Sequence, residues 1–127
     1  MIRLMTEKPA INVVNDQIGS PTYAADLAAA IVHIIGLATN PTTPHFIPGI
    51  YNYSNEGQIS WFDFALAIKN LIGSTCNVGS TTSANYPTPA KRPHYSLLDK
   101  TRIKNTYNLT IPDWQTSLAT CIKHLRP

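Results

Sequence analysis

The chain has 127 residues, of which 43% are hydrophobic and 13% are charged. This composition excludes a disordered tail and allows a modest hydrophobic core, so residues 1–127 are expected to form a single domain or a fragment of one. The formal net charge of +3 is small and mostly scattered, which argues against a nucleic-acid-binding protein.

The first third of the chain predicts a strand, a structured loop and a helix. Residues 11–14 are rich in β-forming side chains and stop at a run of turn-forming residues, 15–21. Thr22 is the expected N-cap of the helix that follows, and Gly36 is its expected end. Helical spacing predicts that one face is buried and consists of Leu27, Ile31, Ile34 and Ile35.

The middle of the chain predicts a loop, a strand and a second helix. Residues 40–48 contain three prolines and form an exposed connection, whereas residues 49–53 have the composition of a strand. Ser60 is the predicted N-cap of the next helix, Asp63 makes a shortened capping box with it, and Gly73 ends the helix. Its predicted buried stripe is Phe64, Ile68, Leu71 and Ile72.

The last third predicts a short strand, an irregular segment and two helices. Residues 76–80 form the strand, and residues 81–93, with three prolines, cannot be a regular element. Residues 98–104 form a short helix, and Asp113 caps a final one. The inward positions of that final helix are expected to be Trp114, Leu118, Cys121, Ile122 and Leu125.

Membrane, metal and disulfide sites are not expected. The most apolar stretch, residues 27–37, is much shorter than the roughly 20 residues that cross a bilayer, and no secretory signal precedes it. Cys76 and Cys121 are far apart and read as reduced thiols of a cytoplasmic protein, and the four histidines lack metal-ligand spacing. One group of basic residues in the last third of the chain is suited to binding an anion: Lys91, Arg92, Lys100, Arg102 and Lys104.

The residues of a complete oxidoreductase are missing from this sequence. A dinucleotide site needs a glycine-rich turn, but the six glycines never approach G-x-G-x-x-G spacing. A short-chain reductase needs a tyrosine followed four residues later by a lysine, and none of the six tyrosines has one. There is also no G-x-S-x-G elbow and no cysteine with an evident histidine partner. The sequence therefore points to binding by its patterned loops.

Five blocks of the sequence, in the same order, resemble the dTDP-4-dehydrorhamnose reductase family. They cover essentially the whole chain: residues 13–23 (VVNDQIGSPTY) with 26–28 (DLA), 49–52 (GIYN), 60–65 (SWFDFA), 86–96 (YPTPAKRPHYS) and 111–114 (IPDW). The resemblance implies the C-terminal substrate-binding part of an extended short-chain dehydrogenase, a mixed α/β lobe that lacks most of the Rossmann half. Residues 1–5 look like the end of a helix from the middle of such a protein, so Met1 is either an internal position or a start introduced at this point.

The resemblance also implies a reaction. Members of the family reduce the 4-keto group of dTDP-6-deoxy-L-lyxo-4-hexulose to give dTDP-L-rhamnose, a precursor of bacterial surface polysaccharide. Their N-terminal Rossmann half holds NADPH or NADH and the Tyr-x-x-x-Lys pair, so this chain alone is expected to bind no cofactor and to be inactive. Its implied partners are a dTDP-sugar and that missing half, and a homodimer stays open. A lobe of this kind should expose a hydrophobic patch larger than a few hundred Å².

The resemblance singles out four candidate substrate-binding residues. Arg92 is the first, because related nucleotide-sugar enzymes place an arginine of a similar R-P motif on the pyrophosphate, where its fork of donors fits phosphate oxygens. Asp16 and Gln17 are candidates to orient the nucleotide-sugar, although a tight turn would use the same residue types. His94 lies in the Arg92 motif and is either a phosphate neighbour or a loop histidine with a backbone partner. One departure is that no arginine lies near Gly19, where many related dehydratases and epimerases carry one.

For the aromatic residues near these motifs, a structural role is a simpler interpretation than ligand binding. Trp61 is expected in the core or an interface, and Trp114 in helix packing. Tyr86 and Tyr95 could line the substrate cleft, although tyrosine is commonly half-buried for other reasons.

Two other functions stay open. One is a non-catalytic module such as the methionine adenosyltransferase regulatory subunit, which shares the dehydrogenase fold and binds a partner. The other is a reductase of a different nucleotide-linked 4-keto sugar. An intact Tyr-x-x-x-Lys pair upstream of Met1 would favour an enzyme over the module.

Overall fold

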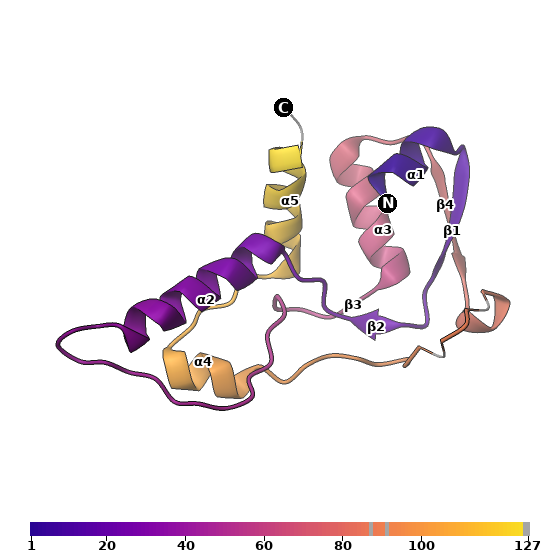
Figure 1. Ribbon diagram of the computed structural model, residues 1–127. Helices are drawn as coiled ribbons and strands as arrows, with labels where there is room; N and C mark the ends of the chain where they lie inside the picture. Colours follow the sequence, from indigo (N-terminus) through magenta and orange to yellow (C-terminus); the bar gives the residue numbers. More distant parts are fainter. Residues whose placement is uncertain (87, 91, 126–127) are drawn as a thin grey trace.

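The computed structural model describes residues 1–86, 88–90 and 92–125. Its elements in chain order are α1 (Ile2–Glu7), β1 (Ala10–Val14), β2 (Ile18–Gly19), α2 (Ala24–Ala38), β3 (Ile59–Ser60), α3 (Trp61–Ile72), β4 (Asn77–Thr81), the 3₁₀ turn η1 (Ser83–Asn85), α4 (Thr101–Tyr107) and α5 (Trp114–Leu125). Figure 1 shows α1, α3, β1 and β4 grouped on one side, α2 and α4 on the other, and α5 between them. This arrangement agrees with the mixed α/β fold predicted from the sequence.

The larger core lies between α3, α5 and the pair β1–β4. β1 and β4 run parallel, from Ala10 opposite Asn77 to Val14 opposite Thr81. Helix α3 covers them with its buried residues Ala65 and Ile68. The remaining buried members of this core are Met5, Cys76, Val78, Trp114, Leu118 and Ile122.

The ends of α3 and the start of α5 follow the predicted local signals. The Ser60 Oγ accepts a hydrogen bond from the Asp63 amide at 3.0 Å and donates one to the Asp63 carboxylate at 2.6 Å. Gly73 ends the helix in the left-handed region, at φ 65°, a conformation that costs glycine little. The Asp113 carboxylate accepts from the Gln115 amide at 2.8 Å, which confirms the predicted cap of α5.

A smaller core joins α2 and α4. Ile103, Tyr107 and Ile111 are buried there, and the partly buried hydrophobic residues packed against them are Ile34, Leu37, Tyr51, Tyr53 and Leu109. The Tyr107 hydroxyl donates to the carbonyl of Ile47 at 2.9 Å, which ties the long loop after α2 to α4.

Asn55 connects the two halves of the structure. Its side chain is fully buried. The amide of Tyr23 donates to its Oδ1 at 2.7 Å, while its Nδ2 lies 2.6 Å from Asp26 Oδ2, 2.9 Å from Ser117 Oγ and 3.1 Å from the carbonyl of Pro112. One side chain therefore joins the start of α2, the start of α5 and the turn that contains Asn55.

Most of the predicted basic cluster is occupied by internal contacts. Lys100 is only 7% exposed, and its Nζ lies 3.3 Å from Glu56 Oε2. Lys104 Nζ lies 2.9 Å from Glu56 Oε1, and this hydrogen bond is the main reason that the pKa of Glu56 is lowered. The Arg102 guanidinium lies over the ring of Tyr51, 4.8 Å from its centre. Lys91 lies outside the described residues. Among the described residues of this cluster, Arg92 is the one that remains for an anion.

Helix α2 corrects three sequence predictions. Its N-cap is Tyr23 and not Thr22, because the contact between the Tyr23 amide and Asn55 decides where the helix begins. The helix continues through Gly36 to Ala38, since a lone glycine weakens a helix without having to end it. Three positions of the predicted buried face are exposed: Leu27, Ile31 and Ile35.

Other differences from the sequence predictions lie outside α2. Residues 49–53, predicted to be a strand, join no sheet of the described chain. Leu71 and Leu125 are exposed, since both point away from the two cores. The helix predicted at residues 98–104 is α4, three residues later, and the irregular segment 81–93 contains the short turn η1. Within the described part of the chain, no helix is both long and apolar enough to span a membrane.

Candidate functional site

One pocket of about 450 Å³ is lined by all four residues that the sequence singled out: Asp16, Gln17, Arg92 and His94. We call it the loop pocket. Its other described lining residues are Ser83, Ala84, Tyr86, Thr88, Pro89 and Ala90.

The parallel pairing of β1 and β4 explains why these loops meet. The carboxyl ends of parallel strands lie at the same edge, so the segments that follow Val14 and Thr81 leave the sheet side by side. The amide of Asn15 continues the pairing by donating to the carbonyl of Thr81 at 2.9 Å. In open α/β sheets, ligands commonly bind beyond the carboxyl ends of strands.

Ser83 holds the Asp16 and Gln17 side chains in place. The Asp16 carboxylate accepts from the Ser83 amide at 2.9 and 3.0 Å and from the Ser83 hydroxyl at 2.8 Å. The same hydroxyl accepts from Gln17 Nε2 at 2.9 Å. The hydrogen bonds from Ser83, led by its amide, lower the pKa of Asp16, so this carboxylate is ionised at neutral pH. Asp16 and Gln17 therefore share a specific hydrogen-bond partner, Ser83, which agrees with their interpretation as turn residues.

Sequence reasoning missed Ser83. It lies in a polar run before a proline-rich segment, and nothing local distinguishes it from its neighbours. Only the knowledge that β1 and β4 are paired would have placed it opposite Asp16.

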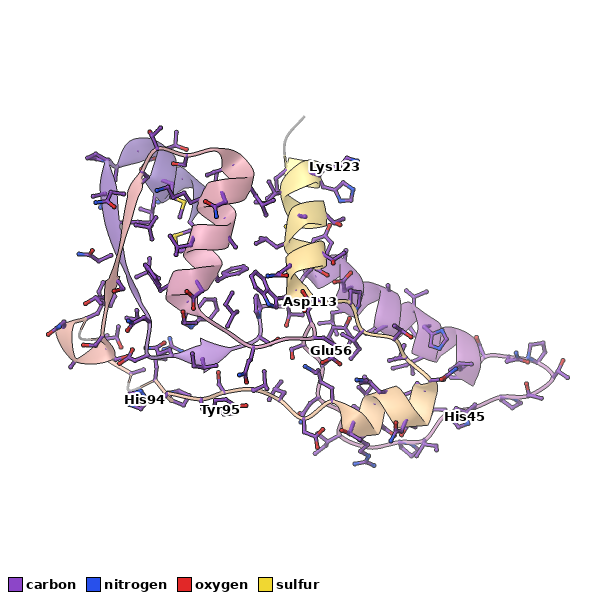
Figure 2. All side chains as sticks on the ribbon, turned by 180° about the vertical axis from the view of Figure 1, so that it is seen from behind. His45, Glu56, His94, Tyr95, Asp113 and Lys123 are labelled. Carbon is purple, nitrogen blue, oxygen red and sulfur yellow. The ribbon has the colours of Figure 1, made fainter. Side chains whose placement is uncertain are left out.

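His94 fixes the second loop to β2. Its Nδ1 lies 3.0 Å from the carbonyl of Asp16, and its own carbonyl accepts from the Ile18 amide at 2.8 Å. Ile18 also forms a parallel bridge with Tyr95, and Figure 2 shows His94 and Tyr95 on the segment that runs alongside β2. His94 is therefore a loop histidine with a backbone partner, and its Nδ1 is already used as a donor.

Arg92 is exposed, and no hydrogen bond or ion pair links its guanidinium to another described residue. Along with Gln17, Tyr86 and Thr88, it also lines an adjoining pocket of about 310 Å³, which we call the apolar pocket. That pocket is otherwise lined mainly by hydrophobic side chains: Met1, Leu4, Ile11, Val13, Val14 and Trp61, with Asn12. Arg92 thus lies between a polar and an apolar pocket.

A side chain at Gly19 would be crowded by Ser96. A Cβ atom at this position would lie 3.0 Å from the hydroxyl oxygen of Ser96. The absence of an arginine near Gly19 therefore agrees with the packing of β2 against the segment after His94.

Replacing Ser83 with alanine is expected to loosen the loop pocket without unfolding the chain. The variant loses the hydroxyl that donates to Asp16 and accepts from Gln17, so the pKa of Asp16 should rise toward its ordinary value of 3.8. Because the folded pKa is the lower one, the contribution of Asp16 to stability is complete above 3.8 and is lost as the pH falls through the lowered pKa. NMR titration of the Asp16 carboxyl measures this change.

Ser80→Ala is the control for this variant, since Ser80 is an exposed serine on β4, three residues away. Its effect on the Asp16 titration should be negligible. Identical Asp16 titrations in wild type and Ser83→Ala would show that the serine hydroxyl does not position this carboxylate.

Comparison with known proteins places these observations in a family. The model of the RmlD substrate binding domain matches residues 1–126. A dTDP-4-dehydrorhamnose reductase of Aggregatibacter actinomycetemcomitans is 37% identical over 124 residues, which are 93% of this chain and 42% of that protein. The reductase of Escherichia coli K12 is 33% identical over 133 residues, with 98% of this chain and 43% of that protein covered.

Solved structures agree with the sequence comparison. A dTDP-4-dehydrorhamnose reductase from Bacillus anthracis, solved in complex with NADP, is 34% identical and superposes with a TM-score of 0.85 over 97% of this chain and 41% of its own. The Clostridium acetobutylicum orthologue gives a TM-score of 0.86 at 31% identity, over 99% of this chain and 42% of its own. The chain spans about two fifths of the relatives it matches, in their C-terminal portion, which confirms the predicted fold class. It belongs to the RmlD substrate binding domain family.

Proposed function

We propose that this chain is the nucleotide-sugar-binding portion of an NADPH-dependent dTDP-4-dehydrorhamnose reductase of the cytoplasm. In this role residues 1–127 hold dTDP-6-deoxy-L-lyxo-4-hexulose while its 4-keto group is reduced to give dTDP-L-rhamnose. The observation that carries the proposal is the loop pocket, which gathers Arg92, Asp16, Gln17 and His94 beyond the carboxyl ends of two parallel strands in a member of this family.

The two adjoining pockets suit the two chemical parts of a nucleotide-sugar. The Arg92 guanidinium lies between them without a hydrogen bond to another described residue, and it would bind the pyrophosphate with two parallel hydrogen bonds. The apolar pocket, with the half-exposed Trp61 ring in its wall, would receive an aromatic base. Asp16, Gln17 and His94 would act by holding the loops that carry Arg92, through the bonds to Ser83 and to the backbone.

The cofactor belongs to the remainder of such a reductase. The chain has neither a G-x-G-x-x-G turn nor a tyrosine followed four residues later by a lysine, so its residues do not fit a dinucleotide site. We therefore assign no proton or hydride transfer to it. Its task is to bind and orient the sugar, and a missing N-terminal half would supply the reducing chemistry.

A chimera tests this function. In this chimera the chain replaces the matching part of the Aggregatibacter actinomycetemcomitans reductase, and NADPH oxidation is followed by fluorescence. The chimera should oxidise NADPH only when the dTDP-4-keto sugar is present, whereas the 127-residue chain alone should show no sugar-dependent oxidation. A non-catalytic binding module would not restore sugar-dependent turnover, and turnover by the chain alone would contradict the division of roles.

A further inference from the structure

Lys100 is a buried lysine that the proposed function does not use. Its Nζ lies 3.2 Å from the carbonyl of Asn55, 3.5 Å from Ser54 Oγ and 3.3 Å from Glu56 Oε2. The three protons of an ammonium group thus have three acceptors. All three acceptors belong to consecutive residues, so Lys100 binds a single turn of the chain.

That turn, residues 54–57, also receives the chain that leaves the loop pocket after β2. We call it the central turn. Ser20 Oγ lies 2.6 Å from the carbonyl of Asn55 and 2.6 Å from that of Gly57. The carbonyl of Asn55 therefore accepts from both Ser20 and Lys100. Two segments that are far apart in the sequence are joined at this one atom.

The Arg92 segment, residues 92–100, runs alongside β2 before it reaches the central turn (Figure 1). The Ile18 amide donates to the carbonyl of His94 at 2.8 Å, and the Ser96 amide donates to the carbonyl of Ile18 at 2.9 Å. This pairing fixes the segment near its start, and the buried lysine fixes its end.

The other edge of β2 pairs with β3, which leads directly into Trp61. Ile18 lies opposite Ser60 in this antiparallel ladder. β2 therefore sets how the Arg92 segment lies relative to Trp61, and both Arg92 and Trp61 line the apolar pocket. A small slip of the segment along β2 would change the spacing between the guanidinium and this ring.

We propose that Lys100 is a positioning residue for Arg92. It fixes the end of the Arg92 segment on the central turn, where Ser20 also fixes β2, and so sets where the guanidinium lies. Lys100 lines neither the loop pocket nor the apolar pocket, so its effect passes through the segment. The proposal rests on the proposed function for the identity of the anion that Arg92 binds.

Lys100→Met tests the proposal, because methionine is an unbranched side chain of similar length without the charge. In this variant Ser20 still donates to the carbonyl of Asn55, and Lys104 still pairs with Glu56. No charged partner is left alone, so the fold should be kept and the Tm should change by less than about 5 °C.

Hydrogen exchange of the 127-residue chain measures the anchoring. In Lys100→Met the amides of Ile18 and Ser96 should exchange at least about tenfold faster than in wild type, since their pairing loses its support at the far end. Lys104→Met is the matched control, because it also removes a positive charge from Glu56, the one described residue that the Lys104 ammonium binds. Exchange in this control should be unchanged. Equal exchange in Lys100→Met and wild type would overturn the proposal.

Kinetics in the chimera defined above measure the functional consequence. Lys100→Met should raise the KM for the dTDP-4-keto sugar about three- to tenfold and change kcat less than about twofold, a coupling typical of residues in one network. In an Arg92→Ala background the same substitution should not raise KM further, because the residue through which it acts is gone. An unchanged KM in the single variant, or an equal rise in both backgrounds, would show that Lys100 does not act through Arg92.

Inorganic pyrophosphate separates this proposal from the proposed function. If the wild-type chimera never turns over the dTDP-sugar, the proposed function is wrong, and the pyrophosphate titration of the Arg92 Nε–H resonance in the 127-residue chain decides the role of Lys100. Lys100→Met should then weaken pyrophosphate binding while Lys104→Met does not, and equal binding in both variants would overturn the proposal. An active chimera in which Lys100→Met changes neither KM nor exchange keeps the proposed function and removes this inference.

Discussion

Arg92→Ala in the chimera is expected to raise the KM for the dTDP-4-keto sugar by about thirty-fold to several hundred-fold. In the proposed role of Arg92, the variant removes charge-assisted hydrogen bonds to the pyrophosphate, which are worth roughly 2 to 4 kcal/mol, and each 1.4 kcal/mol corresponds to a factor of ten. The guanidinium has no other described partner, so its loss should not disturb the loops. Because the pyrophosphate is remote from the reacting carbonyl, kcat should fall only if this binding energy also aligns the sugar.

Two comparison variants sharpen this experiment. Arg92→Lys should recover part of the affinity, because an ammonium keeps the positive charge but loses the planar fork of donors. Lys123→Ala removes a positive charge at the end of α5, which Figure 2 shows well away from His94, and should leave KM unchanged. An unchanged KM in Arg92→Ala would make this arginine an ordinary surface residue.

Asn55→Ala is expected to lower the free energy of unfolding by about 3 to 5 kcal/mol. The substitution leaves the Tyr23 amide without its partner at a fully buried position and removes one of the two donors to the Asp26 carboxylate, the other being the Ser117 hydroxyl. Each polar group left unsatisfied costs about 1 to 3 kcal/mol. Since a typical domain is stable by only about 5 to 15 kcal/mol, the variant should be marginally folded. Urea unfolding, followed by the fluorescence of the buried Trp114, measures the loss.

Asn52→Ala is the matched control for the stability experiment. Asn52 is exposed and makes one side-chain hydrogen bond, from its Nδ2 to the carbonyl of Asp99 at 3.2 Å. Its replacement should cost less than about 1 kcal/mol. Equal unfolding midpoints for the two alanine variants would show that the Asn55 contacts do not hold α2 and α5 together.

The sequence by itself determined the features that depend on neighbouring residues. The serine cap at Ser60 and the glycine end at Gly73 require only residues within one helical turn, and both are present as predicted. The strands at residues 11–14 and 76–80 were predictable from composition for the same reason. The motifs around Asp16 and Arg92 also indicated the family to which the chain belongs.

Tertiary structure alone decided how these pieces meet. The pairing of β1 with β4 joins residues that are 67 positions apart, and it brings Ser83 to Asp16 although neither sequence segment indicates the other. Asn55 is surrounded by α2 and α5 only in the folded chain, and its neighbours in the sequence do not indicate this role. Periodicity showed that α2 has an apolar face, but it could not show that this chain leaves the face uncovered. Burial depends on which distant surface comes to lie there, and that information is absent from any local window of sequence.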